Sequence, residues 1–283
     1  MPLFAGAINP HDIARKQAIF GPAEDDMTHA NSSDSPDAKL GLVSRLGAFA
    51  LIVAIVALIA GAVIMFGVKL GLWEPLQGFV LYRTYFNPIA YTVTALALVA
   101  LVVHLIRRDR TPLVLSVVAL VIGAGMLVPQ VMAALDPPVR APPIHDITTD
   151  TGSPPQFLVL DDTRPGARNS LDYGGAETAE SQKSAFPDIA PIQTDLSGQE
   201  AYQRALKVAG DMGWKTVDAQ DDALRFEATA HTPVFHFADD VVVVVSPAPT
   251  GSRVDIRSVS RVGRGDRGVN AARVRAFLDA FGA

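Results

Sequence analysis

An uncharged run from Leu46 to Val68 constrains this chain more than any other feature of its sequence. The run lies between Arg45 and Lys69 and contains only apolar residues and glycine. About 20 such residues are enough to cross the hydrocarbon core of a bilayer as a helix. Because only helices and closed barrels satisfy their backbone hydrogen bonds within lipid, the run is predicted to be a transmembrane helix.

Two further apolar segments follow, Pro88–Ile106 and Leu113–Leu135. The first contains no acidic or fixed basic residue, and the second is apolar apart from Ser116 and Gln130. Three such runs in close succession leave too little polar sequence to cover them in a soluble core. Residues 45–135 are therefore predicted to form an α-helical transmembrane bundle of three helices, with the lipid bilayer as its first partner.

The connection between the first two helices is rich in aromatic residues. Trp73, Tyr82 and Tyr85 suit a membrane interface, because each ring has an apolar body and a polar edge. A short interfacial helix is expected here. Within the helices, small residues let neighbouring backbones approach closely, and the candidates for this role are Ala57, Gly61, Gly123 and Gly125.

Basic residues near the helix ends predict the orientation. Five lie on one side of the predicted bundle and three on the other: Lys39, Arg45, Arg107, Arg108 and Arg110 against Lys69, Arg83 and Arg140. Since Lys and Arg concentrate in cytoplasmic loops, the N-terminus is expected in the cytoplasm and everything after Leu135 outside it. The expected location is a bacterial inner (plasma) membrane with a periplasmic C-terminal domain.

The N-terminal region and the composition exclude several classes of protein. Residues 1–44 show no secretory signal, so the first helix is expected to act as an uncleaved anchor. Their Asp, Ser, Pro and Ala content predicts a mobile cytoplasmic tail. The absence of cysteine excludes disulfides and cysteine-based zinc sites. A net charge of −5 argues against nucleic-acid binding, and neither a metal nor another cofactor is expected.

After a proline-rich linker (136–143), residues 144–283 are long enough for one domain. Ser197 and Glu200 form a capping box ahead of a helix with an apolar stripe. Four strand-like runs follow, at 214–219, 223–230, 241–246 and 253–260, and the chain closes on an amphipathic helix. The predicted order is helix, four strands, helix, which is an α+β domain with an antiparallel sheet.

Strand alternation sorts the charged residues of this sheet onto one face. Arg225 and Glu227 share a face in one strand, and Asp255 and Arg257 do so in another. If both strands flank the apolar run at 241–245, the four side chains lie together. They form either cross-strand ion pairs on a solvated face or a polar binding surface.

The connection between the last strand and the last helix is the most site-like segment. Its glycines spell G-x-G-x-x-G, but the chain has no second parallel strand for a dinucleotide fold. Anion binding is the remaining functional interpretation, and helix capping by Asp266 or Asn270 is the structural alternative. The candidate ligand-binding residues are Arg225, Glu227, Arg257, Ser258, Ser260, Arg261, Gly263, Asp266, Gly268 and Asn270.

Several separated motifs carry a resemblance to a known family. They are Ile144–Asp150 with Pro154 and Pro155, Arg225–Thr229, Asp239–Val242, and Asp255 to Asn270. In this order they resemble the domain of unknown function 1499 family. The resemblance implies the identity of the domain and an exported location in a bacterial cell envelope. It implies no activity and no catalytic residues.

Three functional hypotheses follow. The preferred one is a membrane protein that presents a non-catalytic module, which binds an anionic envelope ligand or a partner protein. The second is a membrane-anchored hydrolase that uses His145 and Asp150, with Asp146 beside them, because a histidine near carboxylates can activate water. The third is a structural subunit of a membrane complex.

Overall fold

The computed structural model describes residues 41, 45–137 and 141–282. The expected mobile tail, apart from residue 41, and the middle of the expected linker lie outside these residues. Contacts divide the chain into residues 1–45 and residues 46–283. All the helices and strands discussed below belong to the second unit.

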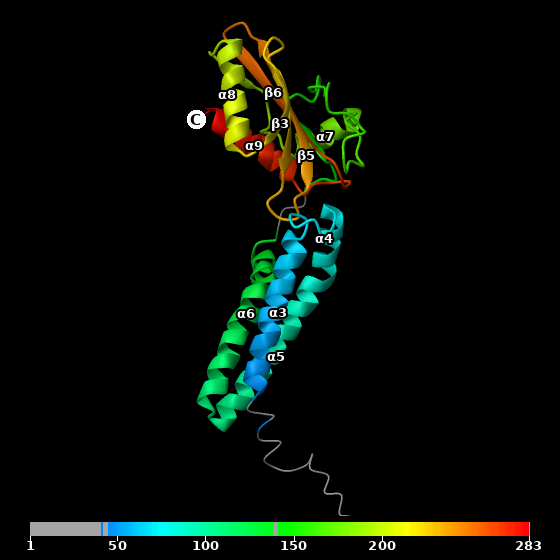
Figure 1. Ribbon diagram of the computed structural model, residues 1–283. Helices are drawn as coiled ribbons and strands as arrows, with labels where there is room; N and C mark the ends of the chain where they lie inside the picture. Colours follow the sequence, from blue (N-terminus) through cyan, green and yellow to red (C-terminus); the bar gives the residue numbers. More distant parts are fainter. Residues whose placement is uncertain (1–40, 42–44, 138–140, 283) are drawn as a thin grey trace, which may run out of the picture. The chain divides into compact units, whose positions relative to one another are not determined.

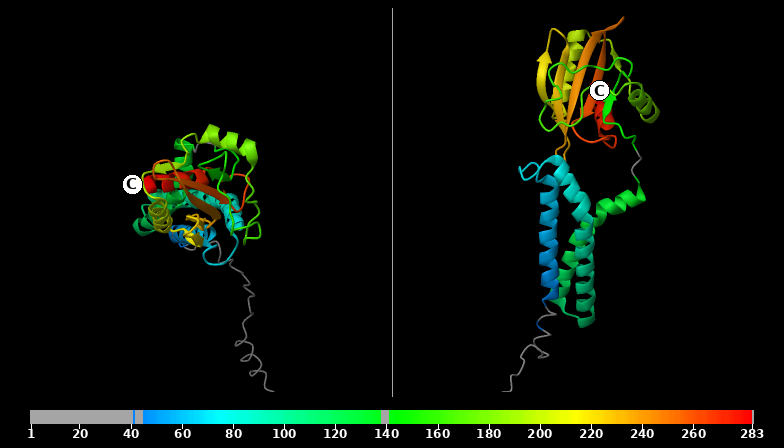
Figure 2. Two further views of the ribbon diagram at one scale, coloured as in Figure 1. Left: turned by 90° about the horizontal axis from the view of Figure 1, so that it is seen from above. Right: turned by 90° about the vertical axis from the view of Figure 1, so that its right-hand side faces the viewer.

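Three helices of this unit are long and apolar enough to cross a membrane, which confirms the predicted helical region. They are α3 (Leu46–Phe66), the continuous helix Pro75–Arg107, whose larger part is α5 (Asn87–Arg107), and α6 (Arg110–Leu135), shown side by side in Figure 2. The expected interfacial helix is α4 (Pro75–Leu81). It continues through a π-helical turn, η2 (Tyr82–Phe86), directly into α5.

Small residues line the inside of the bundle, as predicted for Ala57, Gly61 and Gly123. A Cβ built on Gly123 would come within 2.7 Å of the Thr94 hydroxyl of α5, so this glycine permits the close approach of the two helices. The prediction is wrong for Gly125. It lies on the outer face of α6, where an added Cβ would meet nothing within 4 Å.

The C-terminal domain is built on an entirely antiparallel sheet in the order β1-β6-β5-β4-β3. The four predicted strands are confirmed as β3 (Lys215–Gln220), β4 (Arg225–His231), β5 (Ala238–Pro247) and β6 (Ser252–Ser260). Two strands of three residues were not predicted. They are β1 (Asp146–Thr148) and β2 (Ile192–Thr194), which pair with successive parts of β6 along the same edge.

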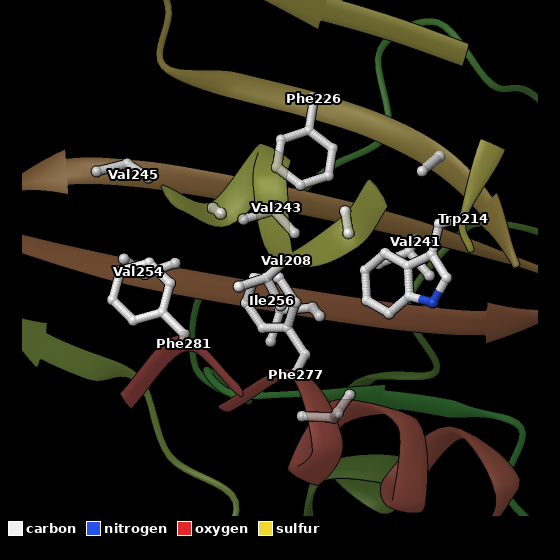
Figure 3. Close-up of a cluster of buried hydrophobic side chains, with 14 of the residues drawn as sticks. Val208, Trp214, Phe226, Val241, Val243, Val245, Val254, Ile256, Phe277 and Phe281 are labelled. Carbon is white, nitrogen blue, oxygen red and sulfur yellow. The ribbon is translucent and has the colours of Figure 1, made fainter. Parts of the chain in front are cut away.

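Two amphipathic helices cover one face of the sheet, α8 (Gly198–Asp211) and α9 (Val269–Gly282). The predicted capping box starts α8, where the Glu200 amide donates to the Ser197 hydroxyl at 3.3 Å. Figure 3 shows the core between these helices and the sheet. The largest fully buried aromatic side chains of this core are Tyr202, Phe226, Phe277 and Phe281, of which the three phenylalanines are labelled in the figure.

The opposite face of the sheet is covered by an irregular segment, residues 149–174, which leads into α7 (Gly175–Ala185). Figure 1 shows this green segment across the sheet from α8. The Gln182 side chain of α7 exchanges two hydrogen bonds with the backbone of Thr148, at 3.0 and 2.6 Å. It thereby pairs the backbone N–H and carbonyl groups at the outer edge of β1, as a further strand would.

The spacing of α5 and α6 gives a test of the bundle. Gly123→Leu forces a side chain into the Thr94 backbone, so we expect a clear fall in thermal stability in detergent. Gly125→Leu is the matched control, because it adds the same side chain to the outer face of the same helix. Equal thermal unfolding curves for the two variants would contradict this packing.

Candidate functional site

The predicted clustering of charged residues on one sheet face is confirmed. Glu227 and Arg257 are both paired with Val242 of β5, and Arg225 and Asp255 with Val244, so the four lie in two neighbouring rows. Of the two interpretations of this face, the one with ion pairs on a solvated surface is wrong about the solvation. Arg257 is 0% exposed and Glu227 is 1% exposed, because residues 149–174 cover them.

Arg257 is the most connected of these side chains. Its guanidinium donates to both carboxylate oxygens of Asp146, at 3.0 and 2.7 Å. It also donates to the carbonyl oxygens of Pro155 and Leu171, at 3.1 and 2.7 Å. The aromatic rings of Phe157 and Tyr173 lie at 5.5 and 5.4 Å from it. One cation therefore joins β6 and β1 to both halves of the covering segment.

Burial dominates the protonation behaviour of this cluster. It raises the pKa of Asp146, and the opposing effect of the Arg257 hydrogen bonds and charge is smaller. Burial, helped by the negative charge of Asp146, raises the pKa of the Tyr173 hydroxyl to about 12. The Tyr173 hydroxyl is buried and has no hydrogen-bond partner among the described residues.

Glu227 holds the middle of the covering segment. Its carboxylate accepts from the backbone N–H groups of Leu158, Val159 and Leu160, the shortest at 2.5 Å, and from the Arg225 guanidinium at 2.8 Å. Three successive amides thus point inward at one buried anion. This is an internal nest of the kind that elsewhere binds external anions.

A second buried carboxylate, Asp240, organises the other end of the sheet. It accepts from Arg164 at 2.6 Å, from Arg261 at 2.8 Å and from the Thr229 hydroxyl at 3.0 Å. Arg164 comes from the covering segment and was not predicted. The signal available for it is weak, because an arginine in an aperiodic, proline-containing stretch is more often solvated.

The glycine-containing loop between β6 and α9 is held by its own polar residues. Asp266 accepts from the backbone N–H groups of Gly268 at 2.8 Å and Asn270 at 2.6 Å, so it caps α9. Asn270 is buried and bonds Ser258, Ser260 and the carbonyl oxygen of His145. The structural alternative foreseen for Asp266 is confirmed.

Beside this loop the domain contains a cleft of about 310 Å³. That volume lies at the lower end of the range for small-molecule sites. His145 lines the cleft, and its Nδ1 atom lies 3.4 Å from the Arg264 carbonyl oxygen. The other polar side chains on its wall are Asp146, Asn169, Asp172, Thr178 and Arg264.

The first turn of α7 also opens into the cleft through Gly174 and Thr178. Gly174 is the N-cap residue and offers no side-chain cap to the helix amides. Arg264 is exposed and forms no ion pair with any described residue. The cleft therefore combines one unpaired cation, a histidine and the positive end of a helix, with Asp172 on its wall.

Of the residues considered for catalysis, His145 and Asp146 line the cleft, but Asp150 does not. Asp146 is bound on both oxygens by Arg257, while Asp150 accepts from Arg253 at 2.6 Å. Backbone hydrogen bonds from Ser153 and Gly152, together with Arg253, lower the pKa of Asp150. Among the described residues, no carboxylate hydrogen-bonds the His145 ring, and no three His, Asp or Glu side chains are grouped to hold a metal.

The ion pair at Arg257 gives a quantitative test. Arg257→Ala leaves the buried Asp146 carboxylate unpaired, so we expect a loss of about 3–5 kcal/mol in the free energy of unfolding. Urea unfolding followed by Trp214 fluorescence, in a Trp73→Phe background, measures it. The control is Lys207→Ala, which removes an exposed pair with Asp211 and is expected to cost less than about 1 kcal/mol.

Comparison with known proteins adds the family. Residues 146–281 match the family model described as protein of unknown function (DUF1499), which spans the whole sheet together with α7, α8 and nearly all of α9. A search of curated proteins found no match. The match confirms the resemblance seen in the sequence motifs. The C-terminal domain of this chain belongs to the DUF1499 family, and three apolar helices precede it.

Proposed function

We propose that this protein is anchored in a bacterial inner membrane and displays its DUF1499 domain in the periplasm as a non-catalytic binding module. Its ligand is a small anionic molecule of the cell envelope, which also carries hydroxyl or amino groups. The ligand binds in the cleft between His145 and Arg264. The observation that carries the proposal is the guanidinium of Arg264, which forms no ion pair with a described residue and lines a cleft of suitable size.

Three other candidate arginines are less suitable for a ligand, because each already forms an ion pair within the domain. Arg225, Arg257 and Arg261 each form a short ion pair with a buried carboxylate, at 2.7–2.8 Å. A ligand that displaced Arg257 would leave the buried Asp146 carboxylate unpaired, at a cost of several kcal/mol. One that displaced Arg225 or Arg261 would remove a charged partner from Glu227 or Asp240. Arg264 requires no such displacement. An anion beside it gains a charge-assisted hydrogen bond, which is stronger than a neutral one.

The other groups on the cleft wall refine the ligand class. Asp172 and the carbonyl oxygen of Arg264 are acceptors, and the Thr178 hydroxyl can donate. The Asn169 amide already donates to the carbonyl oxygens of Ser260 and Gly263. A purely anionic ligand would meet the charge of Asp172, so hydroxyl or amino groups on the ligand are needed to match it. Glycerol phosphate has this combination and serves as the probe below.

A hydrolase is the second candidate, since the cleft joins His145 to the arginine loop. We favour binding because a general base needs a partner that orients its ring, and the carboxylate foreseen for that role, Asp150, is held by Arg253. Within the part of the chain that the structure describes, the one polar contact of the His145 ring is the 3.4 Å approach of its Nδ1 atom to the Arg264 carbonyl oxygen.

Orientation in the membrane is tested separately. Basic residues at the α5–α6 turn, namely Arg107, Arg108 and Arg110, favour a cytoplasmic turn and a periplasmic domain. A reporter enzyme that is active only outside the cytosol, fused behind Ala283, should therefore be active in cells. Activity from a cytosol-dependent reporter at the same position would reverse the assignment.

Ligand binding is tested by calorimetry on the full chain in detergent, with glycerol phosphate as the titrant. Arg264→Gln removes the unpaired cation, and we expect affinity to fall at least about tenfold, because a hydrogen bond to a charged group is worth about 1.5–3 kcal/mol. Arg168→Gln is the matched control, an exposed arginine outside the cleft wall. No binding by the wild-type chain, or equal losses in both variants, would reject the site.

A further inference from the structure

A second cavity lies on the other side of the same loop. Its volume is about 320 Å³ and its wall is mostly apolar. Leu76 and Phe79 of α4 form one side, and Val234, Phe235, Phe237 and Val262 of the C-terminal domain form the other. Nothing in the proposed binding of a small anion at Arg264 uses this cavity.

The aromatic part of the wall is held in a defined geometry. The Phe79 ring lies 5.6 Å from Phe235 and 6.0 Å from Phe237, in both cases edge to face. The Phe235 amide donates to the carbonyl oxygen of Met65, in the last turn of α3, at 3.2 Å. The end of the β4–β5 hairpin is thus attached to the end of a membrane helix.

The hairpin adopts an unfavourable backbone to make these contacts. Phe235 and His236 have φ values of 60° and 52°, in the left-handed region that favours glycine. The Thr232 hydroxyl stabilises the turn, because it accepts from the Phe237 amide at 2.9 Å and donates to the Val234 carbonyl oxygen at 2.8 Å. Backbone strain of this kind is often found where a protein holds residues in place for a ligand.

The level of the cavity along the bundle points to lipid. Its α4 wall belongs to the N-terminal end of the second candidate membrane span, Pro75–Arg107, and Trp73, Tyr82 and Tyr85 lie at this end. Aromatic residues of this kind mark the depth at which acyl chains meet headgroups. An apolar cavity at this depth can accept an acyl chain of a neighbouring lipid.

The charged groups on the cavity wall indicate which lipid headgroup the cavity favours. Asp239 is paired with Arg273 at 2.5 Å, and Asp266 is occupied by the amides of α9. Arg267 is exposed and lies over the Phe79 ring at 5.4 Å, and it forms no ion pair with any described residue. Arg267 is therefore the cation on the wall that the described residues leave without an ion pair, and the Asp266 carboxylate lies on the same wall.

We propose that this cavity binds an anionic phospholipid. One acyl chain lies against Phe79, Phe237 and Val262, and the phosphate of the headgroup pairs with Arg267. The cavity then links the domain to the membrane that carries it, through a lipid as well as through the polypeptide.

The test uses the full chain in phosphatidylcholine vesicles with a small fraction of photoactivatable phosphatidylglycerol, whose acyl chain carries the reactive group. We expect crosslinks in the peptide that contains Phe235 and Phe237, several-fold more than with photoactivatable phosphatidylcholine. Arg267→Gln should remove this preference for the anionic lipid. Val262→Trp should fill the cavity and reduce labelling by both lipids.

Arg264→Gln is the matched control, since it changes a neighbouring arginine that lines the other cleft, and labelling should remain at the wild-type level. The same variant also separates the two proposals, because its affinity for glycerol phosphate is expected to fall while its labelling by lipid stays unchanged. Labelling confined to the membrane helices would overturn the inference. Equal labelling by the two lipids, or an unchanged preference in Arg267→Gln, would overturn it as well, and this exposed substitution leaves the fold intact.

Discussion

The cation of Arg257, withdrawn completely from water, is the constraint on which the domain depends. A buried guanidinium is tolerated only when its hydrogen-bonding groups are matched, and here they are matched by Asp146 and by two carbonyl oxygens of the covering segment. Because these partners lie far apart in sequence, satisfying one side chain fixes the position of an otherwise irregular stretch. The segment needs no regular secondary structure to be ordered.

The same rule separates structural arginines from available ones. Arg164 and Arg261 share the buried carboxylate of Asp240, and Arg273 is paired with the buried carboxylate of Asp239. Two arginines of the β6–α9 loop, Arg264 and Arg267, have no such partner among the described residues. They line different cavities, one polar and one apolar. A ligand gains most from charges that the fold has not already used.

Sequence reasoning succeeded where a repeating pattern spans many residues. Uninterrupted apolar runs predicted the three long helices, and alternation placed Glu227 and Arg257 on one face. It failed for β1 and β2, because three residues are too few for a period, and their pairing with β6 is a tertiary effect. The sequence also did not reveal that the charged sheet face is covered, since no local pattern shows that residues 149–174 fold back over it.

The loop at 261–268 shows why a glycine pattern is a poor guide to chemistry. Gly263 and Gly268 have φ values of 97° and 84°, and a Cβ on Gly265 would come within 2.9 Å of the Pro143 backbone. The glycines are thus required by turns and by close packing, and the helix amides that would attract a phosphate are occupied by Asp266. What the glycines provide is a compact loop, with Arg264 on one side and Arg267 on the other. The chemistry of this loop therefore belongs to the residues between the glycines.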